Sequence, residues 1–408
     1  MNNEQTQNNS LYYHRGTALP WAFIAVIVLG TTSPVYGSSS ETIQPEFGLL
    51  IVSFLFLMGM SQAGVVFCAI HRLAYAQWAK PYYRLAELST LAFFPFAIVG
   101  FLLIFYFAKD DLFYWLSASP DAHLSPWLNS DWLLIRNLLG LLVFYGLSAI
   151  YVWKGLRPDL AGASDVDHRQ VERQLYLLSP LVIISFVVCN TFFAWDFAMM
   201  LIPHWHSTVF PIQYWFGNLY AGTAALLAFP ALLHRFSVKE SHFGPRQIRG
   251  ISTVISGFML LWLYFFWAQF FVFWFGNLPH ETGPLWRQMY GHYAPFYWTM
   301  MATCFFIPFV ALIFALVNRS LLAMCIIGLG INVGIWINKY LMLVPVFSPN
   351  DRPLDNLLDV SLSIGLLAGF IAVLVLLARR LPLYSYWEIN LAPEAVGLFD
   401  GDSDHSKD

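Results

Sequence analysis

Side chains that can carry protons or hold a polar head group gather at the joint between two long apolar stretches, over residues 192–218. The joint contains the acid Asp196, followed by Trp205 between His204 and His206. Such groups are costly near hydrocarbon, so their presence there indicates a function. Histidine titrates near neutral pH and a carboxylate accepts protons, which points to proton transfer. A simpler explanation is that Trp205 and His206 anchor the helix ends at the membrane surface and that His204 is a solvated loop residue.

The composition is that of a protein with many membrane-spanning helices. Of the 408 residues, 58% are hydrophobic and only 11% are charged, whereas soluble domains carry about a quarter charged residues. The net charge of −3 and the lack of a basic run give no indication of nucleic-acid binding. Because a spanning helix needs about 20 mostly apolar residues, the sequence predicts an all-α fold of about ten transmembrane helices. They are expected near residues 18–36, 47–70, 88–108, 132–153, 175–197, 210–233, 251–276, 293–317, 321–345 and 360–378.

The positions of Lys and Arg indicate the orientation, because cytoplasmic loops are enriched in both. If the N-terminus is cytoplasmic, most of the 21 Lys and Arg residues fall on the inner side. We therefore expect a multi-pass protein, surrounded by membrane lipid, with both termini in the cytoplasm. Residues 1–17 and 381–408 are then cytoplasmic tails, and residues 18–380 form the transmembrane domain. The outer side keeps Lys109, Arg136, Arg287, Lys339 and Arg352.

Polar side chains at a common depth predict a proton path near the outer ends of the fifth, seventh and ninth helices. An unpaired charge is costly at this depth, so Asp196, Arg136 and Lys339 must find partners or water. Lys339 could instead extend to the outer surface. Gln62 and Asn218 are more simply explained as hydrogen-bonding contacts between helices. The candidate members of the path are Asp196, His204, His206, Gln269, Glu281 and Lys339.

The sequence offers no recognisable site for a redox cofactor or a metal. A membrane cytochrome b holds haem between histidines inside its helices, whereas all 11 histidines here fall in tails, in loops or at helix ends. The four cysteines stand singly in apolar runs, so none forms a Cys-x-x-Cys zinc or iron–sulfur motif. Any redox chemistry must therefore use a diffusible substrate such as quinol, or cofactors on partner subunits.

Two stretches resemble one known family. Residues 195–210, WDFAMMLIPHWHSTVF, resemble the W-D/Y-x-M-S-L-x-P-H-W-x-S-T-x-F run of the NrfD-like (polysulfide-reductase-type) integral subunits of bacterial alternative complex III. Residues 266–282, FWAQFFVFWFGNLPHET, are similar to that family's Y-x-x-F-S-Q-Y-x-L-I-W-Y-A-N-I-P-E-E-T run. The resemblance is closest to the second, smaller NrfD-like chain of the complex. Here Ala268 replaces the Ser before the Gln, and His280 stands where the family often has Glu.

This resemblance implies two four-helix bundles, one of helices 2–5 (residues 47–197) and one of helices 6–9 (residues 210–345), with helices 1 and 10 at the periphery. It also implies a place in a quinol:cytochrome c oxidoreductase, or in one with another periplasmic acceptor, in the bacterial inner membrane. The expected partners are a second NrfD-like membrane subunit and periplasmic subunits that carry multihaem cytochrome c and iron–sulfur clusters. In that family the smaller chain is thought to conduct protons and to hold the complex together.

The favoured hypothesis is therefore a non-haem membrane subunit that handles protons in a quinol-oxidising complex. A second hypothesis is that the chain binds quinol or quinone itself, through Asp196, His204, His206 and Trp205. A histidine would then hydrogen-bond a quinol oxygen, and Asp196 would accept its proton. A third hypothesis is a secondary transporter, and a fourth is a purely structural anchor for periplasmic redox subunits. A transporter is disfavoured because the sequence has no clear internal repeat and no matched pair of interrupted helices.

The charge distribution makes the topology testable. Green fluorescent protein fused to the C-terminus should fluoresce, and alkaline phosphatase at the same point should be inactive, because the basic loops hold that end in the cytoplasm. Fusions in the predicted outer loop at residues 277–292 serve as the control and should give the reverse pattern. A C-terminal fusion that is active only in the periplasm would contradict this orientation.

Overall fold

The computed structural model describes residues 48–116, 126–161, 167–202, 205–228, 243–277, 279–347 and 357–390. Within these ranges the regular structure is helical, and eight helical segments are long and apolar enough to cross a membrane. The protein is therefore an all-helical, multi-pass membrane protein, as the composition predicts. The eight segments are Gly48–Leu73, Gln77–Phe107, Ser130–Leu160, His168–Met199, Pro245–Gly276, Gly291–Ile313, Leu321–Pro345 and Val360–Arg380.

Each of these segments overlaps one of the ten predicted spans. Three of them begin at least six residues earlier than predicted, at Gln77, His168 and Pro245. Charged residues near these starts lower the local hydropathy. They are buried in the first two, as at Arg84 and Glu172, and exposed in the third, at Arg246 and Arg249. The predicted span 18–36 lies outside the described residues. For the predicted span 210–233, the structure describes a helix of 16 residues, Phe210–Ala225.

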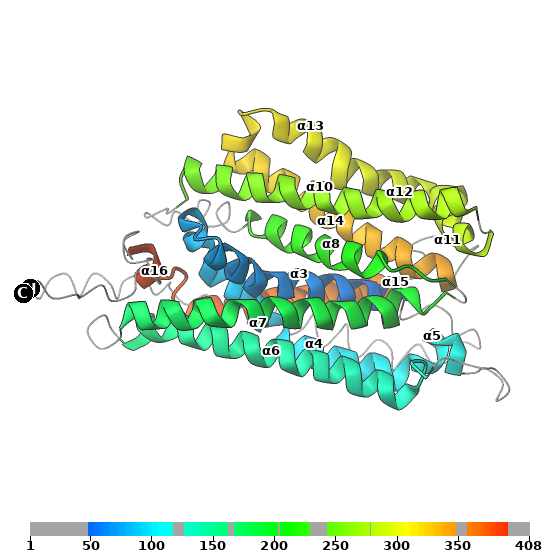
Figure 1. Ribbon diagram of the computed structural model, residues 1–408, viewed down its shortest axis with the longest axis horizontal. Coiled ribbons are helices and arrows are strands. Elements are labelled where there is room, and N and C mark those ends of the chain that lie inside the picture. Colours follow the sequence, from blue (N-terminus) through cyan, green and yellow to red (C-terminus); the bar gives the residue numbers. More distant parts are fainter. Residues whose placement is uncertain are drawn as a thin grey trace, which may run out of the picture.

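The helices lie side by side along the long axis of the molecule (Figure 1). The long ones are α3 (Gly48–Leu73), α4 (Lys80–Phe107), α6 (Ser130–Ala161), α7 (His168–Ala194), α8 (Phe210–Ala225), α10 (Pro245–Gly276), α14 (Leu321–Phe347) and α15 (Leu357–Arg380). The eighth predicted span is divided into α12 (Ala294–Met301), the π-helical turn η6 (Ala302–Phe306) and α13 (Ile307–Ile313). Short elements at the ends are α5 (Lys109–Leu112), the π-helical turn η4 (Trp195–Met199), α11 (Pro279–Met289) and α16 (Tyr386–Asn390).

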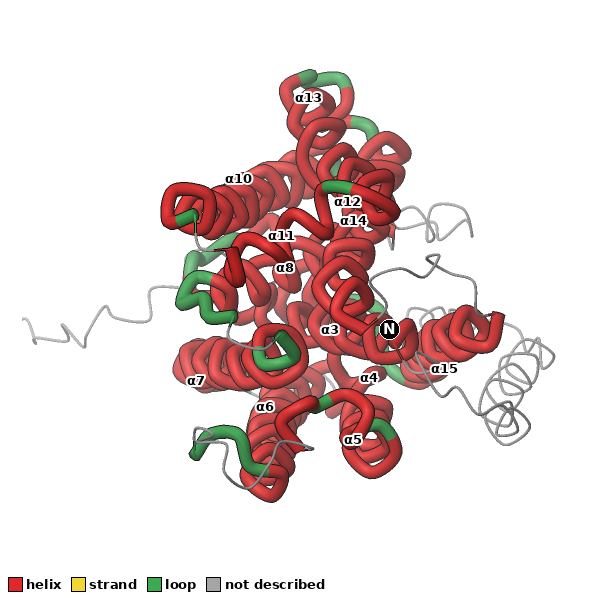
Figure 2. Tube along the Cα trace, turned by 90° about the vertical axis from the view of Figure 1, so that its right-hand side faces the viewer, coloured by secondary structure: helices red, strands yellow, loops and turns green. Residues whose placement is uncertain are grey.

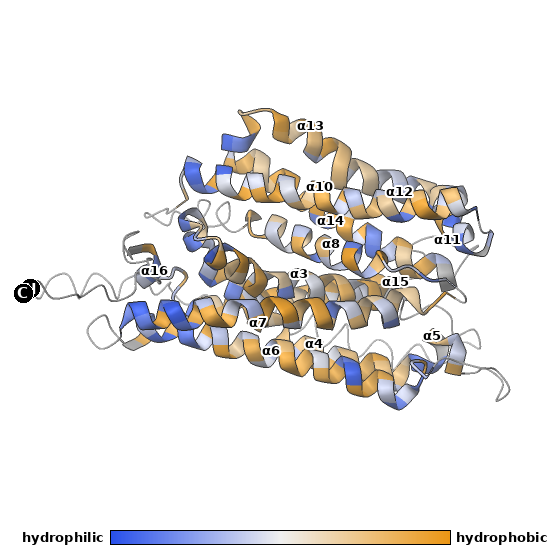
Figure 3. Ribbon diagram, in the orientation of Figure 1, coloured by the Kyte–Doolittle hydropathy of each residue, from blue (hydrophilic) through white to orange (hydrophobic). Residues whose placement is uncertain are grey.

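The two ends of the molecule differ in charge. α16 lies at one end, and α5 and α11 lie at the other (Figure 1). We call the α16 end the basic end, because Arg72 and Arg379 lie in the last turns of α3 and α15 there, and Arg157 lies four residues before the end of α6. The opposite end is called the far end. Hydrophilic residues gather at both ends, and apolar residues dominate between them (Figure 3), which is the pattern expected of a chain that crosses a bilayer.

α3 is the central helix. It contacts α4, α7, α8, α14 and α15, and the end-on view shows it among them (Figure 2). Within its most apolar stretch 89% of the residues are buried, against 22% for the corresponding stretch of α10. Glycines allow the close contacts of α3, since Gly64 lies against the backbone of α4 at Ala86, and Gly222 of α8 lies against Ala63. Small residues at such contacts let helix backbones approach each other within a membrane.

The contacts between helices group them into two sets. In the first set, α4 contacts α3 and α6, and α7 contacts α6 and α3, so these four helices close a ring. In the second set, α8 contacts α10 and α14, and α14 contacts α12 and η6. α3 joins the two sets through its contacts with α8 and α14.

The contact at Gly222 predicts the effect of a larger side chain. A Cβ atom at this position would lie 2.5 Å from the Cβ of Ala63 and 2.7 Å from Met60 O. Gly222→Leu should therefore lower the thermal stability of the detergent-solubilised protein, since overpacking costs about 1–3 kcal/mol. Gly257→Leu is the matched control, because nothing lies within 4 Å of that position and leucine favours a helix. Equal melting temperatures for the two variants would contradict the close packing of α3 and α8.

Candidate functional site

Asp196, the acid of the predicted proton path, is buried and paired with Arg136 of α6. The guanidinium donates from Nη2 to Oδ1 at 2.6 Å and from Nε to Oδ2 at 2.8 Å. Asn137 Nδ2 donates to Oδ2 at 2.5 Å, and Trp127 Nε1 donates to Oδ1 at 3.1 Å. Four donated hydrogen bonds thus meet the two carboxylate oxygens, which offsets the cost of burying the charge.

A π-helical turn positions Asp196. α7 ends at Ala194, and the chain continues through η4, where Met200 N–H donates to Trp195 O at 2.7 Å, five residues back. Such turns are rare and are often found at functional sites. Arg136 also donates from Nη1 to Trp127 O at 2.8 Å, and its guanidinium lies 4.2 Å from the centre of the Trp127 ring. One ion pair therefore joins η4, α6 and the segment that precedes α6.

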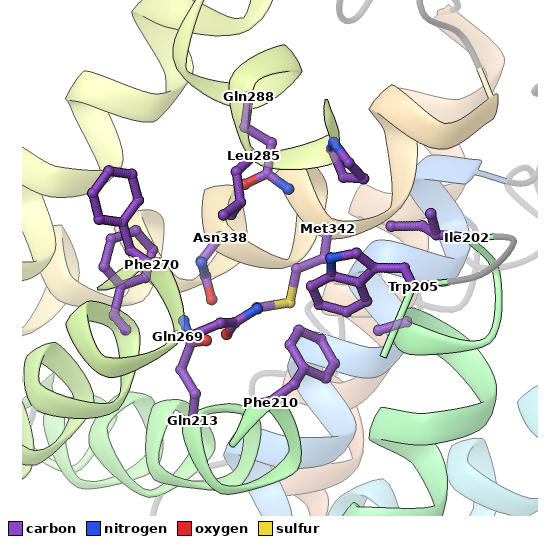
Figure 4. A pocket seen from close by; sticks show the side chains of 13 residues that line it. Ile202, Trp205, Phe210, Gln213, Gln269, Phe270, Leu285, Gln288, Asn338 and Met342 are labelled. Atoms are coloured by element: carbon purple, nitrogen blue, oxygen red, sulfur yellow. The ribbon is translucent and has the colours of Figure 1, made fainter. Parts of the chain in front are cut away.

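Gln269 and Trp205 line one small cavity near the far end (Figure 4). The figure shows Gln213 of α8, Gln269 of α10 and Asn338 of α14 turned toward a common space, with Gln288 of α11 at its edge. Trp205 Nε1 is buried without a hydrogen-bond partner among the described residues. The cavity has a volume of about 40 Å³, which is room for a few water molecules and less than a quinol ring occupies.

Lys339 follows the cavity-lining Asn338 in α14, but its ammonium group packs against Tyr214 of α8. Nζ lies 2.9 Å from the centre of the Tyr214 ring and has no hydrogen-bond partner among the described residues. The residue is 1% exposed, so the prediction that Lys339 could extend to the membrane surface is wrong. A neighbouring aromatic face attracts a cation, which compensates only part of the cost of burying it without an anion.

The predicted convergence of the path candidates is only partly seen. Gln269 lines the cavity, and Glu281 lies on the face of α11 that carries the lining residues Pro284 and Gln288, three and seven positions later. The hydrogen-bond partners of Asp196 instead lie on α6 and on the segment before it. Arg136 of α6 supplies two of the donors.

Of the two histidine candidates, the structure describes only His206. His206 is exposed, as expected of an anchor at the membrane surface. His204 lies outside the described residues. The predicted quinol ligands at residues 196–206 are therefore not seen around one space large enough for a quinol head group in the described part of the chain.

Three buried amides connect α8, α7 and α3 in the middle of the molecule. Asn218 Nδ2 donates to Asn190 Oδ1 at 2.7 Å, and Asn190 Nδ2 donates to Gln62 Oε1 at 2.8 Å. All three residues are at most 1% exposed. These are the hydrogen-bonding contacts between helices that were expected of Gln62 and Asn218.

The basic end holds a network of buried charges that the sequence alone did not reveal. Arg72 of α3 forms ion pairs with Glu172 of α7 and with Glu388 of α16, the second at 2.9 Å. Its Nε also donates to Tyr151 OH of α6 at 2.9 Å. The side chains of Arg72 and Glu388 are each 2% exposed. One arginine of α3 therefore holds three other helices.

Arg84 of α4 is the second centre of this network. It forms ion pairs with Glu87 at 2.7 Å and with Asp159 of α6 at 2.5 Å, and it donates to Gly155 O at 3.1 Å and to Ser385 Oγ at 3.3 Å. Glu87 is 1% exposed, and its second oxygen, Oε1, has no hydrogen-bond partner among the described residues. The spacing of Arg84 and Glu87 on one helical face, at the edge of an apolar run, is the sequence signal that indicates this pair.

α16 closes the network and lies within residues 381–408, the predicted C-terminal tail. Trp387 Nε1 donates to Gly155 O at 2.9 Å, and Tyr384 and Trp387 are 4% and 7% exposed. Burial raises the pKa of Tyr384 to about 12. Residues 384–388 thus include core positions of the helical domain.

Comparison with models of known protein families and with curated proteins gives no match for this chain. Its class as a polytopic, all-helical membrane protein rests on the helices themselves. The resemblance to NrfD-like subunits rests on the two motifs at residues 195–210 and 266–282.

The geometry around Asp196 predicts a structural effect of its substitution. Asp196→Asn leaves Arg136 buried without an anion, so it should destabilise the solubilised protein by about 3–5 kcal/mol. The double variant Asp196→Leu with Arg136→Met strands no charge and should recover much of this loss. Asp131→Asn, at an exposed position at the start of α6, is the control and should melt like the wild type. Wild-type melting of Asp196→Asn would argue against a structural pair.

Proposed function

We propose that the chain is a non-haem integral membrane subunit of a quinol-oxidising complex of the NrfD-like type. The complex passes electrons to cytochrome c or another periplasmic acceptor, and this chain conducts protons and helps to hold the complex together. The electron carriers belong to its partners, which are a second NrfD-like membrane subunit and periplasmic multihaem cytochrome c and iron–sulfur subunits. In the bacterial inner membrane, the basic end and both termini face the cytoplasm.

Two observations make this class of function the favoured one. The motifs at residues 195–210 and 266–282 resemble the family. The contacts of α3, α4, α6 and α7 with one another, and those of α8 with α10 and α14 and of α14 with α12, support the proposal of two four-helix bundles.

The observation that carries the proton role is a series of buried polar groups along the first set of helices. It begins with Asp196 and Arg136 near the far end, continues through Gln62 and Asn190, and ends with the ion pairs around Glu87 at the basic end. Buried ionisable groups in a membrane protein are costly and mark ion or proton pathways by default. Neutral amides between the charged ends can hold the water that a proton path needs.

Within this series, Glu87 is the best candidate for a proton carrier. Its Oε2 accepts from Arg84, while its Oε1 has no partner among the described residues. A proton can bind at Oε1 without displacing a hydrogen bond. Asp196 has no such vacancy, because a proton there would displace one of its four donors. We therefore assign proton transfer to Glu87 and a structural role to Asp196.

The far-end cavity favours proton handling over quinol binding by this chain. Its volume of about 40 Å³ and its lining of Gln213, Gln269 and Asn338 suit water. Quinol is then oxidised on the partner membrane subunit, and the amides around Trp205 lie on the outlet for the protons.

Glu87→Gln tests the proton role. The variant keeps the size of the side chain, and Arg84 retains Asp159 as its anion, so the complex should assemble. Quinol turnover and the proton movement coupled to it should fall by about tenfold or more, because the amide cannot take up the proton. Glu172→Gln is the matched control, since Arg72 retains Glu388 in the same way, and it should turn over at the wild-type rate.

The same preparation tests membership of a redox complex. The tagged chain should copurify with other subunits that carry covalent haem, which a haem stain of the gel detects. Wild-type turnover by Glu87→Gln would remove the proton role of this residue. A chain that purifies alone and moves a solute across vesicles would overturn the complex itself and favour the transporter.

A further inference from the structure

An open groove of about 390 Å³ lies between α6 and α7 toward the basic end. It is separate from the buried polar series, because it lies on the exposed face of the two helices, where Trp153 and Ile150 are 64% and 50% exposed. Lys154 and Arg157 of α6 and Gln174 of α7 supply its polar lining. The groove therefore combines an apolar wall with two cations.

Within the described residues, neither cation forms an ion pair with an acid. Lys154 Nζ donates to Gln174 Oε1 at 2.7 Å, which links the two helices and leaves two further donors on the ammonium group. Arg157 is exposed, and no hydrogen bond or ion pair to it is found within the described residues. Among the described acids near the groove, Asp159 and Glu172 are engaged by Arg84 and Arg72 in the interior. Asp167 accepts from the backbone N–H groups of the first turn of α7. A net positive groove of this kind suits a phosphate group.

The depth of the groove matches that of a lipid head group. Arg157 and Lys154 lie four and seven residues before Ala161, the last residue of α6, which places them roughly 6 and 10 Å from its end. An exposed tryptophan such as Trp153 is typical of the membrane–water interface.

Exposed apolar residues continue from the groove toward the far end on both helices. Val143 and Leu139 of α6 are 45% and 57% exposed, and Leu177 and Leu181 of α7 are 61% and 50% exposed. Gly146 of α6 comes between Val143 and the groove residues in the sequence, and nothing lies within 4 Å of its Cβ position. These two apolar surfaces extend in the direction in which acyl chains run from a head group at the basic end.

We infer that this groove binds an anionic phospholipid. The lipid phosphate lies between Lys154 and Arg157, the glycerol region packs on Trp153, and the acyl chains follow the exposed apolar faces of α6 and α7. Charge complementarity identifies the head group, since basic pockets between membrane helices bind anionic lipids. The apolar wall selects a lipid over free phosphate, which would leave Trp153 and Ile150 uncovered.

Native mass spectrometry of the full chain in detergent tests this inference. Phosphatidylglycerol, phosphatidylcholine and inorganic phosphate are added in separate experiments. We expect wild type to retain phosphatidylglycerol, to retain less phosphatidylcholine and to retain no phosphate. Arg157→Gln should retain at least threefold less phosphatidylglycerol, and Lys154→Gln with Arg157→Gln less still. The matched control is Arg379→Gln with Arg380→Gln, which removes two exposed cations of α15 from the same end and should bind like wild type.

Arg157→Gln alone keeps the test decisive, because an exposed side chain without a partner contributes little to folding. If this variant retains as much phosphatidylglycerol as wild type, the inference is overturned. It is also overturned if inorganic phosphate binds and displaces the lipid, since the groove would then be a site for a free anion. An equal loss of lipid in the Arg379 and Arg380 control would show a general effect of surface charge and would equally overturn it.

Discussion

Arg72 and Arg84 bring two positive charges into the protein interior, and the basic end is arranged around neutralising them. Their partners come from α4, α6, α7 and α16. Removing one partner of a buried pair costs about 3–5 kcal/mol, whereas replacing a whole pair by apolar residues is often neutral. These pairs therefore act chiefly on the arrangement of the helices. α3 cannot slide along α7, and α16 cannot leave the bundle, without breaking an ion pair of Arg72.

The same constraint explains how polarity is distributed along the molecule. The buried ion pairs of the first set of helices lie near the two ends, and the middle is crossed by the neutral amides of Gln62, Asn190 and Asn218. A charge is most expensive at the centre of a bilayer, while an amide that is hydrogen-bonded on both sides is not. Lys339 departs from this pattern, because the Tyr214 ring is its only described partner and offers no negative charge.

The sequence predicts the spans well because a helix in lipid must satisfy its own backbone hydrogen bonds and must be apolar over a fixed length. It fails where charged side chains lower the hydropathy of a helix start, so three predicted spans begin too late, at residues 88, 175 and 251. In the first two, other helices bury these charges. The pairing of Arg136 with Asp196, 60 residues apart, depends on which helices are neighbours. That of Arg72 with Glu388, 316 residues apart, further depends on the folding back of the chain after α15. Neither ion pair can be predicted from the spacing of residues along the chain.

A proton carrier needs an environment that tolerates both of its protonation states, and this requirement separates Glu87 from Asp196. All the strong acceptor directions of Asp196 are used, so η4 and α6 hold it as an anion that fixes structure. Glu87 keeps one oxygen free, and that oxygen faces α6 at Gly155, where an added Cβ would lie 3.3 Å from it. A larger side chain at this position would fill the space in which water can reach Oε1. The absence of a side chain on α6 thus matters as much to the chemistry of Glu87 as the arginine that binds its other oxygen.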